Sequence, residues 1–273
     1  MNDNRTIIVT GASGSMGSEA VRALAGQGDN VIMACRNLSK AESVRRDILK
    51  DIPGAEIDVV ELDLSSMASV KTFADSVAGM KIDALFNNAG IINRDYRRTE
   101  DGYESTLATN YIGPFYLTRL LLPQMPAGSN IVNMVSLTCR FGDVDRTLFE
   151  RGEKEFHQLR TYSNTKLALL LSSVALSRRY EGIHVNVADP GIVNSNMISM
   201  GRWFDPLADI LFRPFCRSPR KGVAPALRAL RTDCDLHCFI GRRDEALDKT
   251  VLDHPMIDWL WDETEKLLPL RPQ

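Results

Sequence analysis

A tyrosine and a lysine four residues apart, Tyr162 and Lys166, are the pair in this sequence best suited to acid–base chemistry. The pattern around them predicts a helix, and residues at positions i and i+4 lie on one face of a helix. An ammonium close to a phenol favours the phenolate and lowers the pKa of the tyrosine toward neutral pH. The same spacing is common in surface pairs with no catalytic role, so the pair alone does not decide the function.

Two further polar residues lie at positions that suggest chemistry. Ser136 follows the apolar run 130–135, so its hydroxyl is expected at the carboxyl edge of a sheet, where it could hold a carbonyl oxygen that gains negative charge. Asn110 lies inside a predicted helix just before Gly113 and Pro114. That position indicates either a local kink or a functional amide, and the sequence leaves both open.

A glycine-rich turn joins the first predicted strand to the first predicted helix. It reads Thr10-Gly11-Ala12-Ser13-Gly14-Ser15-Met16-Gly17. Glycines permit a tight turn and close approach of backbone N–H groups, and a helix N-terminus carries partial positive charge, so this turn suits a pyrophosphate. Glycines in such turns also serve purely steric roles, but the position between the first strand and the first helix favours a nucleotide site.

The end of the second predicted strand indicates which dinucleotide binds. An NAD(H) site usually has an Asp or Glu about twenty residues after the turn, on the ribose 2′-hydroxyl, whereas this chain has Arg36. A guanidinium pairs well with a 2′-phosphate, so the sequence favours NADP(H), with Ser13 and Lys40 as helpers and NAD(H) as the alternative. Arg36 could instead be a solvated helix-start arginine. Asp63 could reach the adenine or lead into the next helix.

Cys234, His237 and Cys238 lie close together in the chain and raise the question of a zinc site. A tetrahedral site needs a fourth ligand and usually a second spaced pair. The sequence offers neither, so we predict no metal and interpret these residues as the flanks of a late strand.

The elements that must position these residues alternate between short apolar runs and longer helical stretches. Strands are predicted over 6–10, 30–34, 56–61, 82–87, 130–135, 184–189 and 237–240. Helices are predicted over 16–25, 38–50, 66–78, 104–122, 158–180 and 222–231. This alternation predicts one α/β domain over residues 1–273, a doubly wound parallel sheet with helices on both faces. Ligands are expected beyond the carboxyl ends of its strands.

Length, charge and composition exclude several classes of protein. The 273 residues include 33 Lys and Arg against 35 Asp and Glu, with no basic stripe of the kind that binds nucleic acid. No apolar run is long enough for a signal peptide or a transmembrane helix. The five cysteines are an odd number without a secretory pattern, so we expect reduced thiols and a cytoplasmic location.

Taken in order over residues 5–240, the motifs resemble those of the short-chain dehydrogenase/reductase family. They are Thr10-Gly11 with Gly14 and Gly17, Asp63-Leu64, Asn87-Asn88-Ala89-Gly90, Asn110, Ser136, Tyr162 with Lys166, and Pro190-Gly191-Ile192-Val193 followed by Ser195. The resemblance implies a Rossmann fold in which Tyr162 is the general acid/base and Lys166 binds the nicotinamide ribose. It further implies that Ser136 orients the carbonyl or alcohol and that Asn110 completes a proton relay through water.

The resemblance also implies cofactor contacts outside the glycine turn. Those near the adenine and beside the cofactor are Asp63, Leu64, Asn87, Asn88, Ala89 and Gly90. Those near the carboxamide are Pro190, Gly191, Val193 and Ser195. In the same scheme Arg36 contacts the 2′-phosphate.

Within the family, the chain is similar to the retinol-dehydrogenase-like branch in Ala34-Cys35-Arg36, in the run 110–123 and in the spacing from Ser136 to Tyr162. That branch generally uses NADP(H) and lipophilic carbonyls or alcohols. The segment of about 196–220 is expected to close over the substrate as an apolar lid, with an amphipathic helix that only caps the core as the alternative. Relatives pair subunits through helices corresponding to 104–122 and 158–180, which implies a homo-dimer or homo-tetramer.

Two other functions use a similar fold. A regulator that senses NADP(H) would bind the cofactor without turnover, but it needs no set such as Ser136, Tyr162 and Lys166. An extended-type sugar-nucleotide epimerase or dehydratase would explain Ser15 in the glycine turn, but it needs a larger C-terminal domain than this chain provides. We therefore predict an NADP(H)-dependent oxidoreductase that transfers a hydride between nicotinamide and a carbonyl or alcohol.

Overall fold

One sheet of eight strands organises the computed structural model, which describes residues 4–193 and 217–270. The strand order is β3-β2-β1-β4-β5-β6-β7-β8, and every neighbouring pair is parallel except β7 and β8. The strands are β1 (Thr6–Thr10), β2 (Asn30–Cys35), β3 (Ile57–Glu61), β4 (Ala84–Asn87), β5 (Asn130–Met134), β6 (His184–Asp189), β7 (His237–Ile240) and β8 (Arg243–Ala246). The seven predicted strands are confirmed, with ends shifted by at most two residues.

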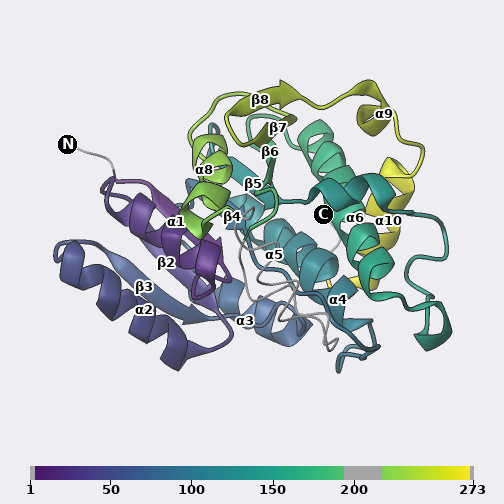
Figure 1. Ribbon diagram of the computed structural model, residues 1–273, viewed down its shortest axis with the longest axis horizontal. Helices are drawn as coiled ribbons and strands as arrows, with labels where there is room; N and C mark the ends of the chain where they lie inside the picture. Colours follow the sequence, from purple (N-terminus) through teal and green to yellow (C-terminus); the bar gives the residue numbers. More distant parts are fainter. Residues whose placement is uncertain (1–3, 194–216, 271–273) are drawn as a thin grey trace.

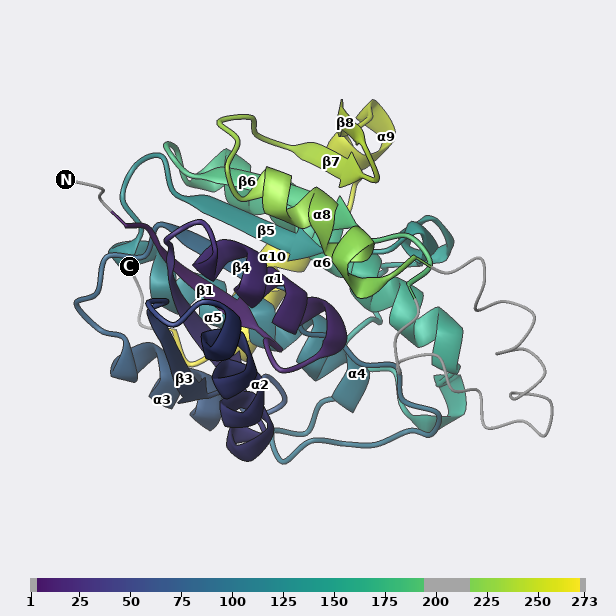
Figure 2. The ribbon, with the colours of Figure 1, turned by 60° about the vertical axis from the view of Figure 1, so that its left-hand side comes forward.

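Helices cover both faces of the sheet, as the doubly wound prediction requires (Figures 1 and 2). One face carries α1 (Ser15–Ala25), α2 (Leu38–Asp51) and α8 (Pro219–Ala229), and the other carries α3 (Met67–Ser76), α5 (Gly113–Leu121) and α6 (Gln158–Arg179). Side chains of β1 alternate between the two layers, because successive residues of a strand point to opposite faces. Ile7 and Val9 pack with Leu24 of α1, whereas Ile8 packs in the layer that contains Phe73 of α3.

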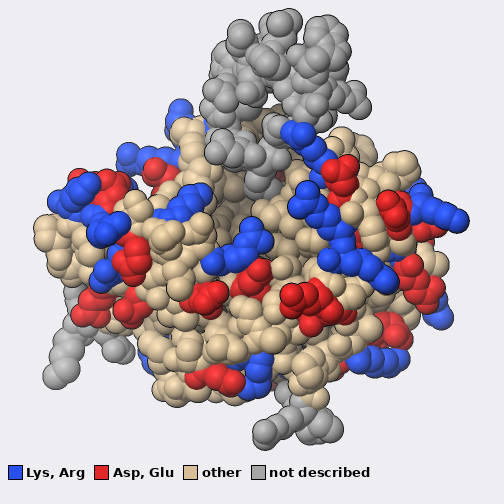
Figure 3. All heavy atoms as spheres, turned by 90° about the horizontal axis from the view of Figure 1, so that it is seen from below, with Lys and Arg blue, Asp and Glu red and all other residues tan. Residues whose placement is uncertain are grey.

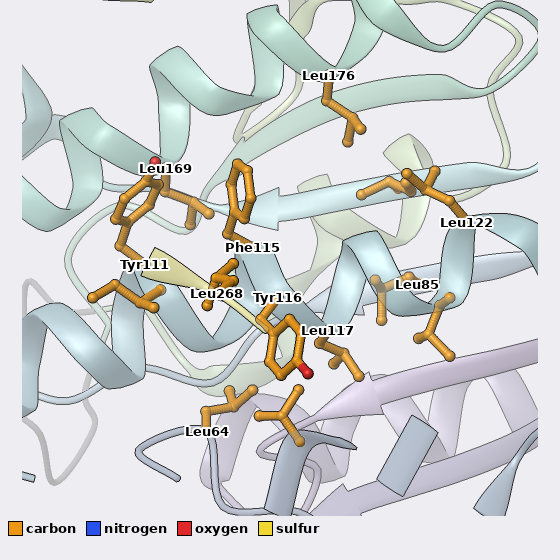
Figure 4. Packing of buried hydrophobic residues seen from close by; sticks show 14 of the residues in the cluster. Leu64, Leu85, Tyr111, Phe115, Tyr116, Leu117, Leu122, Leu169, Leu176 and Leu268 are labelled. Atoms are coloured by element: carbon orange, nitrogen blue, oxygen red, sulfur yellow. The ribbon is translucent and has the colours of Figure 1, made fainter. Parts of the chain in front are cut away.

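The largest of the three hydrophobic clusters lies beneath α3, α5 and α6. Figure 4 shows part of it, with Tyr111, Phe115 and Leu117 facing Leu85 of the sheet and Leu169 of α6. All five side chains are almost completely buried. This packing fixes α5 and α6 against the sheet, and so positions the polar residues near their N-terminal ends.

The predicted helix over 104–122 is interrupted. It consists of α4 (Ser105–Leu107), a π-helical segment η1 (Ala108–Ile112), α5 and a short 3₁₀ turn η2 (Leu122–Gln124). The π-helical turn contains Asn110, and Gly113 begins the regular helix that follows. A Cβ on Gly113 would lie 2.2 Å from the carbonyl oxygen of Leu64, so only glycine allows this helix to approach the end of β3.

Three C-terminal elements are missing from the sequence-based prediction. They are β8, the short helix α9 (Lys249–Leu252) and α10 (Ile257–Leu267). The strand β8 is exposed along its length and so has no apolar alternation to reveal it. The amphipathic α10 buries Ile257, Leu260 and Trp261 against the largest hydrophobic cluster.

The C-terminal helix α10 is anchored on α5 and α6 through Trp261. The ring centroid of Trp261 lies 4.7 Å from that of Phe115, and the guanidinium groups of Arg119 and Arg179 lie 5.7 Å and 5.2 Å from it. Arg119 Nε also donates to Glu265 at 2.7 Å. The helix α10 thus covers part of the surface through which the resemblance implied that subunits pair.

Other expectations about surfaces can be compared with the described residues. No helix within 4–193 or 217–270 has the length and apolar character to cross a bilayer. On the face shown in Figure 3, basic and acidic side chains are interspersed and form no basic stripe. Ser195 and most of the expected lid at about 196–220 lie outside the described residues.

Trp261→Ala should destabilise the fold strongly, because it removes an aromatic anchor that is 3% exposed. Truncation of a buried Trp typically costs about 3–5 kcal/mol of unfolding free energy. Urea unfolding of the parent and the variant measures the change, with the half-buried Trp259→Ala as the matched control. Equal losses for the two variants would contradict the assignment of Trp261 as the anchor of α10.

Candidate functional site

The glycine-rich turn brings the N-terminus of α1 close to the end of β1. Gly11 has φ +62°, in the left-handed region that favours glycine, and Gly14 is the residue that begins the helix as its N-cap. A Cβ on Gly17 would lie 2.3 Å from the carbonyl oxygen of Gly11. The turn is therefore compact, with the N–H groups of the first helical turn directed to the carboxyl edge of the sheet.

A cavity of about 680 Å³ lies at this turn. Most of the predicted cofactor residues line it: Gly11, Ser13, Gly14, Ser15, Met16, Gly17, Arg36, Asp63, Leu64, Asn88, Ala89 and Gly90, together with Lys40. The structure thus brings together residues from four separate segments at the carboxyl ends of β1, β2, β3 and β4. This is the crevice where an open α/β sheet binds its ligand.

Arg36 lies at the rim of this cavity. Its side chain is 71% exposed, and Nη1 is 3.9 Å from Asp63 Oδ2. Asp63 Oδ1 accepts hydrogen bonds from the backbone N–H and the hydroxyl of Ser65, at 2.9 Å and 2.6 Å. The guanidinium is held only weakly by protein groups and is free to bind an anion.

The Asn-Asn-Ala-Gly segment, residues 87–90, begins at the last residue of β4. Asn88, Ala89 and Gly90 line the cavity, but the prediction that Asn87 lies beside the cofactor is wrong. Asn87 is 2% exposed and donates to Thr118 Oγ1 and Asn133 Oδ1 in the core. It stands one residue too early to reach the cavity, because successive strand residues face opposite ways. Asn88 donates to the carbonyl oxygen of Thr10, whose hydroxyl accepts from the N–H groups of Asn88 and Ala89, both at 3.0 Å.

The segment from Pro190 to Val193 follows β6 and lies beside the glycine turn without lining the 680 Å³ cavity. A Cβ on Gly222 of α8 would lie 2.6 Å from Val193 and 3.3 Å from Met16 Sδ, so the two segments meet at this glycine. Gly191 has φ +70° and donates its N–H to Asp189 Oδ1 at 2.7 Å. Val193 forms a single β-bridge with Arg217.

The four residues proposed for chemistry form one cluster. Lys166 is 2% exposed, donates from Nζ to the carbonyl oxygen of Met134 at 2.7 Å, and lies 5.7 Å from the ring centroid of Tyr162. Asn110 is fully buried, and its amide exchanges hydrogen bonds with the backbone of Ile91 at 2.8 Å and 2.9 Å. A Cβ on Gly90 would lie 3.4 Å from Lys166 Nζ and 3.5 Å from Asn110 Oδ1. The π-helical turn therefore directs the amide of Asn110 to the backbone of Ile91, which together with Gly90 lines the cofactor-side cavity.

Burial dominates the ionisation of this cluster. Desolvation raises the pKa of Tyr162 to about 12, while a hydrogen bond with Ser136 acts in the opposite direction. Desolvation lowers the pKa of Lys166 to about 8, and the negative charge of Asp189 opposes this shift. The net shift of the Tyr162 pKa is upward, opposite to the direction expected from an adjacent ammonium alone, because both groups are removed from water.

Sequence reasoning missed Asp189, which ends β6 and faces this cluster. Its carboxylate is 3% exposed, and its charge acts on both Tyr162 and Lys166. Burial raises the pKa of Asp189, while the N–H of Gly191 and the charge of Arg217 oppose that shift. The sequence did contain a signal for Asp189, because this carboxylate comes directly before the Pro-Gly loop, at the carboxyl end of a central strand.

A second cavity of about 910 Å³ lies on the other side of the cluster, and Ser136 and Asp189 line it. Its apolar wall includes Leu167, Leu170, Leu171, Val187, Leu247 and Val251, and its polar rim includes Arg140 and Arg217. Ser136 also begins a 3₁₀ turn, Leu137–Phe141, and its hydroxyl accepts from the N–H of Thr138 at 3.3 Å. The candidate chemical groups thus lie between two cavities.

The fold and the cluster together define a dinucleotide-binding α/β enzyme, and comparisons with known proteins identify the family. A family model described as short chain dehydrogenase matches residues 5–202. Retinol dehydrogenase 13 of Homo sapiens is 30% identical over 281 residues, which cover 97% of this chain and 85% of that protein. The chain therefore belongs to the short-chain dehydrogenase/reductase family, and its similarity to the retinol-dehydrogenase-like branch is confirmed. It is an oxidoreductase that acts on CH–OH groups.

Solved structures agree with this assignment. A putative uncharacterized protein from Mycobacterium Paratuberculosis is 31% identical with a TM-score of 0.78, over 97% of this chain and 95% of that chain. A short-chain dehydrogenase from Sphingobium yanoikuyae in complex with NADPH has a TM-score of 0.67 at 18% identity, over 98% of this chain and 96% of that chain. The second likeness concerns the fold alone.

Lys166→Met should remove a pH dependence of folding stability. Because burial lowers the pKa of Lys166 from 10.5 to about 8, the unfolded chain binds more protons than the folded chain between these values. The unfolding free energy of the parent therefore rises with pH in this window. Relative to the variant, the parent should gain about 2 kcal/mol between about pH 7.5 and about pH 9.5.

Urea unfolding at both pH values measures this gain, and the exposed Lys154→Met serves as the control. Parallel pH profiles for the parent and Lys166→Met would show that the ammonium is not buried as described.

Proposed function

We propose that this protein is an NADP(H)-dependent reductase or dehydrogenase of lipophilic carbonyls or alcohols, with Ser136, Tyr162, Lys166 and Asn110 as its catalytic groups. One observation carries the proposal: these four residues lie together between a cavity lined by the glycine turn and a larger, partly apolar cavity. A regulator that only senses the cofactor has no need of this buried polar cluster or of a second cavity.

The residues present fit a dinucleotide. The glycine turn is so tight that a Cβ at position 17 would collide with the carbonyl oxygen of Gly11, and the first turn of α1 offers backbone N–H groups to a pyrophosphate. Asn88 Oδ1 is buried in the cavity wall without a hydrogen-bond partner among the described residues. Gly11, Gly14, Gly17 and Gly90 would then approach the cofactor closely, and Asp63 would lie toward the adenine.

The proposed mechanism assigns each polar group a task. When bound, the nicotinamide supplies or accepts a hydride at the carbinol carbon. In the direction of reduction, Tyr162 gives its hydroxyl proton to the carbonyl oxygen, and Ser136 donates a hydrogen bond that stabilises negative charge on that oxygen. Lys166 holds a positive charge beside the tyrosine, and Asn110, through Ile91 and a water, connects the site to solvent.

The ionisation of the cluster assigns different tasks to the tyrosine and the lysine. A tyrosine with a pKa of about 12 is protonated at neutral pH, so the proton is present, but the phenol is a weak acid that needs a nearby positive charge to release it. The lysine, with a pKa of about 8, remains mostly charged at neutral pH and stabilises the phenolate that proton transfer leaves.

Two observations support NADP(H) as the cofactor. Arg36 and Lys40 line the rim of the cavity at the end of β2, where the 2′-position of the adenosine ribose lies in such folds. Among residues 4–193 and 217–270, the acidic neighbour of the Arg36 guanidinium is Asp63, at 3.9 Å. A 2′-phosphate would therefore gain a charge-assisted hydrogen bond there, whereas a 2′-hydroxyl gains less.

The substrate class is proposed from the second cavity and from the relatives. Its leucine and valine wall suits an apolar body, and its volume of about 910 Å³ is sufficient for a molecule of drug size. One relative, retinol dehydrogenase 13 of Homo sapiens, is named after retinol, which is a lipophilic alcohol. Ser136 lies at the inner end of this wall, where a reacting oxygen would be held.

We also propose a cytoplasmic location. It is supported by the described cysteines, Cys35, Cys139, Cys234 and Cys238, all of which are free thiols. The homo-dimer or homo-tetramer expected from the sequence stays a prediction. Because α10 covers part of α5 and α6, we place any subunit contact away from that covered surface.

Tyr162→Phe should abolish turnover while NADPH binding changes little, since the variant loses only the hydroxyl that transfers the proton. We expect a loss of at least about 10³-fold in kcat, in the range of a lost general acid, and a Kd for NADPH within a few-fold of the parent. NADPH consumption with a lipophilic carbonyl panel and NADPH fluorescence measure the two quantities. Tyr103→Phe is the control, because the Tyr103 hydroxyl donates to the carbonyl oxygen of Leu267, far from the cluster in the sequence. Near-parental turnover in Tyr162→Phe would refute the catalytic assignment.

Arg36→Asp should move cofactor preference from NADPH toward NADH, because a carboxylate repels the 2′-phosphate and accepts from a 2′-hydroxyl. The ratio of Kd values for the two cofactors should change by at least about tenfold, which corresponds to about 1.4 kcal/mol. Fluorescence titration measures this ratio, and the exposed Arg46→Asp makes the same change of charge elsewhere. An unchanged ratio in Arg36→Asp would remove Arg36 from the site.

A further inference from the structure

The turn before β7 and the edge hairpin of the sheet bring together three metal-ligating side chains that the proposed chemistry does not use. They are Cys234, His237 and Asp244, and their candidate ligand atoms all lie within 4.8 Å of one another. The sequence showed Cys234, His237 and Cys238 but no fourth ligand, and it therefore predicted no metal here. Asp244 comes from β8, a strand that the sequence did not predict.

Strand geometry explains why Asp244 joins the cluster. In the antiparallel pair of β7 and β8, Asp244 lies opposite Phe239, and His237 lies two residues before Phe239 on the same face. His237 Nδ1 and Asp244 Oδ1 are 2.7 Å apart. Cys238 points the other way, because it lines the cavity beside Ser136 with Glu245.

The backbone that carries Cys234 and His237 is fixed by a buried amide. Asn186 of β6 is 1% exposed. Its Nδ2 donates to the carbonyl oxygen of Cys234 at 2.8 Å, and its Oδ1 accepts from the N–H of His237 at 2.9 Å. One rigid side chain thus sets the separation of the two residues, which is the kind of outer support that metal ligands receive in proteins.

The residue between them is held in a strained conformation. Leu236 has φ +56°, and it is the only residue other than glycine with positive φ among those described in 4–193 and 217–270. A residue other than glycine is strained in the left-handed region, and it keeps this conformation only where the surroundings impose it. Here it turns the chain so that Cys234 and His237 face the same side.

We propose that Cys234, His237 and Asp244 bind a divalent transition-metal ion, with Zn²⁺ as the best match and water as the fourth ligand. Thiolate, imidazole and carboxylate are the ligands that Zn²⁺ takes, in tetrahedral sites with bonds of about 2.0–2.3 Å. On binding, the thiol of Cys234 releases its proton to solvent and its sulfur donates an electron pair to the ion. The ion replaces the hydrogen bond between His237 and Asp244 with two coordinate bonds.

The ion would join the edge hairpin to the turn before β7. The side chain of Asp244 is 39% exposed, which leaves it room to turn toward an ion held by Cys234 and His237. A site closed by three protein ligands stabilises the folded state by mass action, since the unfolded chain does not hold the ligands together. The proposal is independent of the oxidoreductase assignment and concerns a different edge of the sheet.

Titration of the full chain with Co²⁺ after treatment with a chelator tests the site. We expect one Co²⁺ per chain with a sulfur-to-cobalt charge-transfer band, and Zn²⁺ should displace it and raise the melting temperature. Cys234→Ser should lose the band, and His237→Gln and Asp244→Asn should weaken Co²⁺ binding at least tenfold. Cys238→Ser, one residue from His237 but on the opposite face, should keep the band.

Either of two results would overturn the proposal. One is the absence of saturable Co²⁺ binding, which would leave His237 and Asp244 as a simple hydrogen-bonded pair. The other is a charge-transfer band that survives in Cys234→Ser or disappears in Cys238→Ser, which would place the metal on another thiol. Because Cys234, His237 and Asp244 are not fully buried, circular dichroism of each variant identifies any loss that comes from unfolding.

Discussion

The buried ammonium of Lys166 is the interaction on which the arrangement of the site depends. Its hydrogen bond to the carbonyl oxygen of Met134 ties α6 to the end of β5, and its charge faces Tyr162 from within the core. An isolated buried charge is costly, so its neighbours must compensate for the lost hydration. Asp189 at the end of β6 supplies opposite charge. The parallel strands make this possible because their carboxyl ends meet at one edge.

Glycines determine how closely the remaining parts approach that edge. Gly17 lets α1 approach the end of β1, Gly113 lets α5 approach the end of β3, and Gly90 leaves room beside Lys166 and Asn110. The π-helical turn adds one further adjustment, because it directs the amide of Asn110 toward Ile91. The glycine turn, the polar cluster and the second cavity thus all lie at the carboxyl ends of the strands.

Much of this arrangement could be predicted from the sequence, and the failures have physical causes. The apolar runs predicted seven strands because buried parallel strands are hydrophobic on both faces, and the glycine turn, Arg36 and Asp63 were recognised by their place after strands. The exposed β8 was missed because it lacks apolar alternation, and with it Asp244 was missed. Asn87 was misplaced because one residue in a strand reverses the direction of the side chain. The upward shift of the Tyr162 pKa depends on burial, which spacing alone does not reveal.

The central claim is that this cluster promotes hydride transfer between NADP(H) and the carbonyl carbon of a lipophilic substrate. The most direct test incubates the protein with NADPH that carries deuterium at both C4 positions and a panel of retinoid, long-chain and aromatic aldehydes and ketones, followed by mass spectrometry of the alcohols. The account predicts one deuterium on the carbinol carbon of at least one product. Tight NADPH binding without deuterium transfer to any member of the panel would contradict it and would favour a cofactor-sensing role.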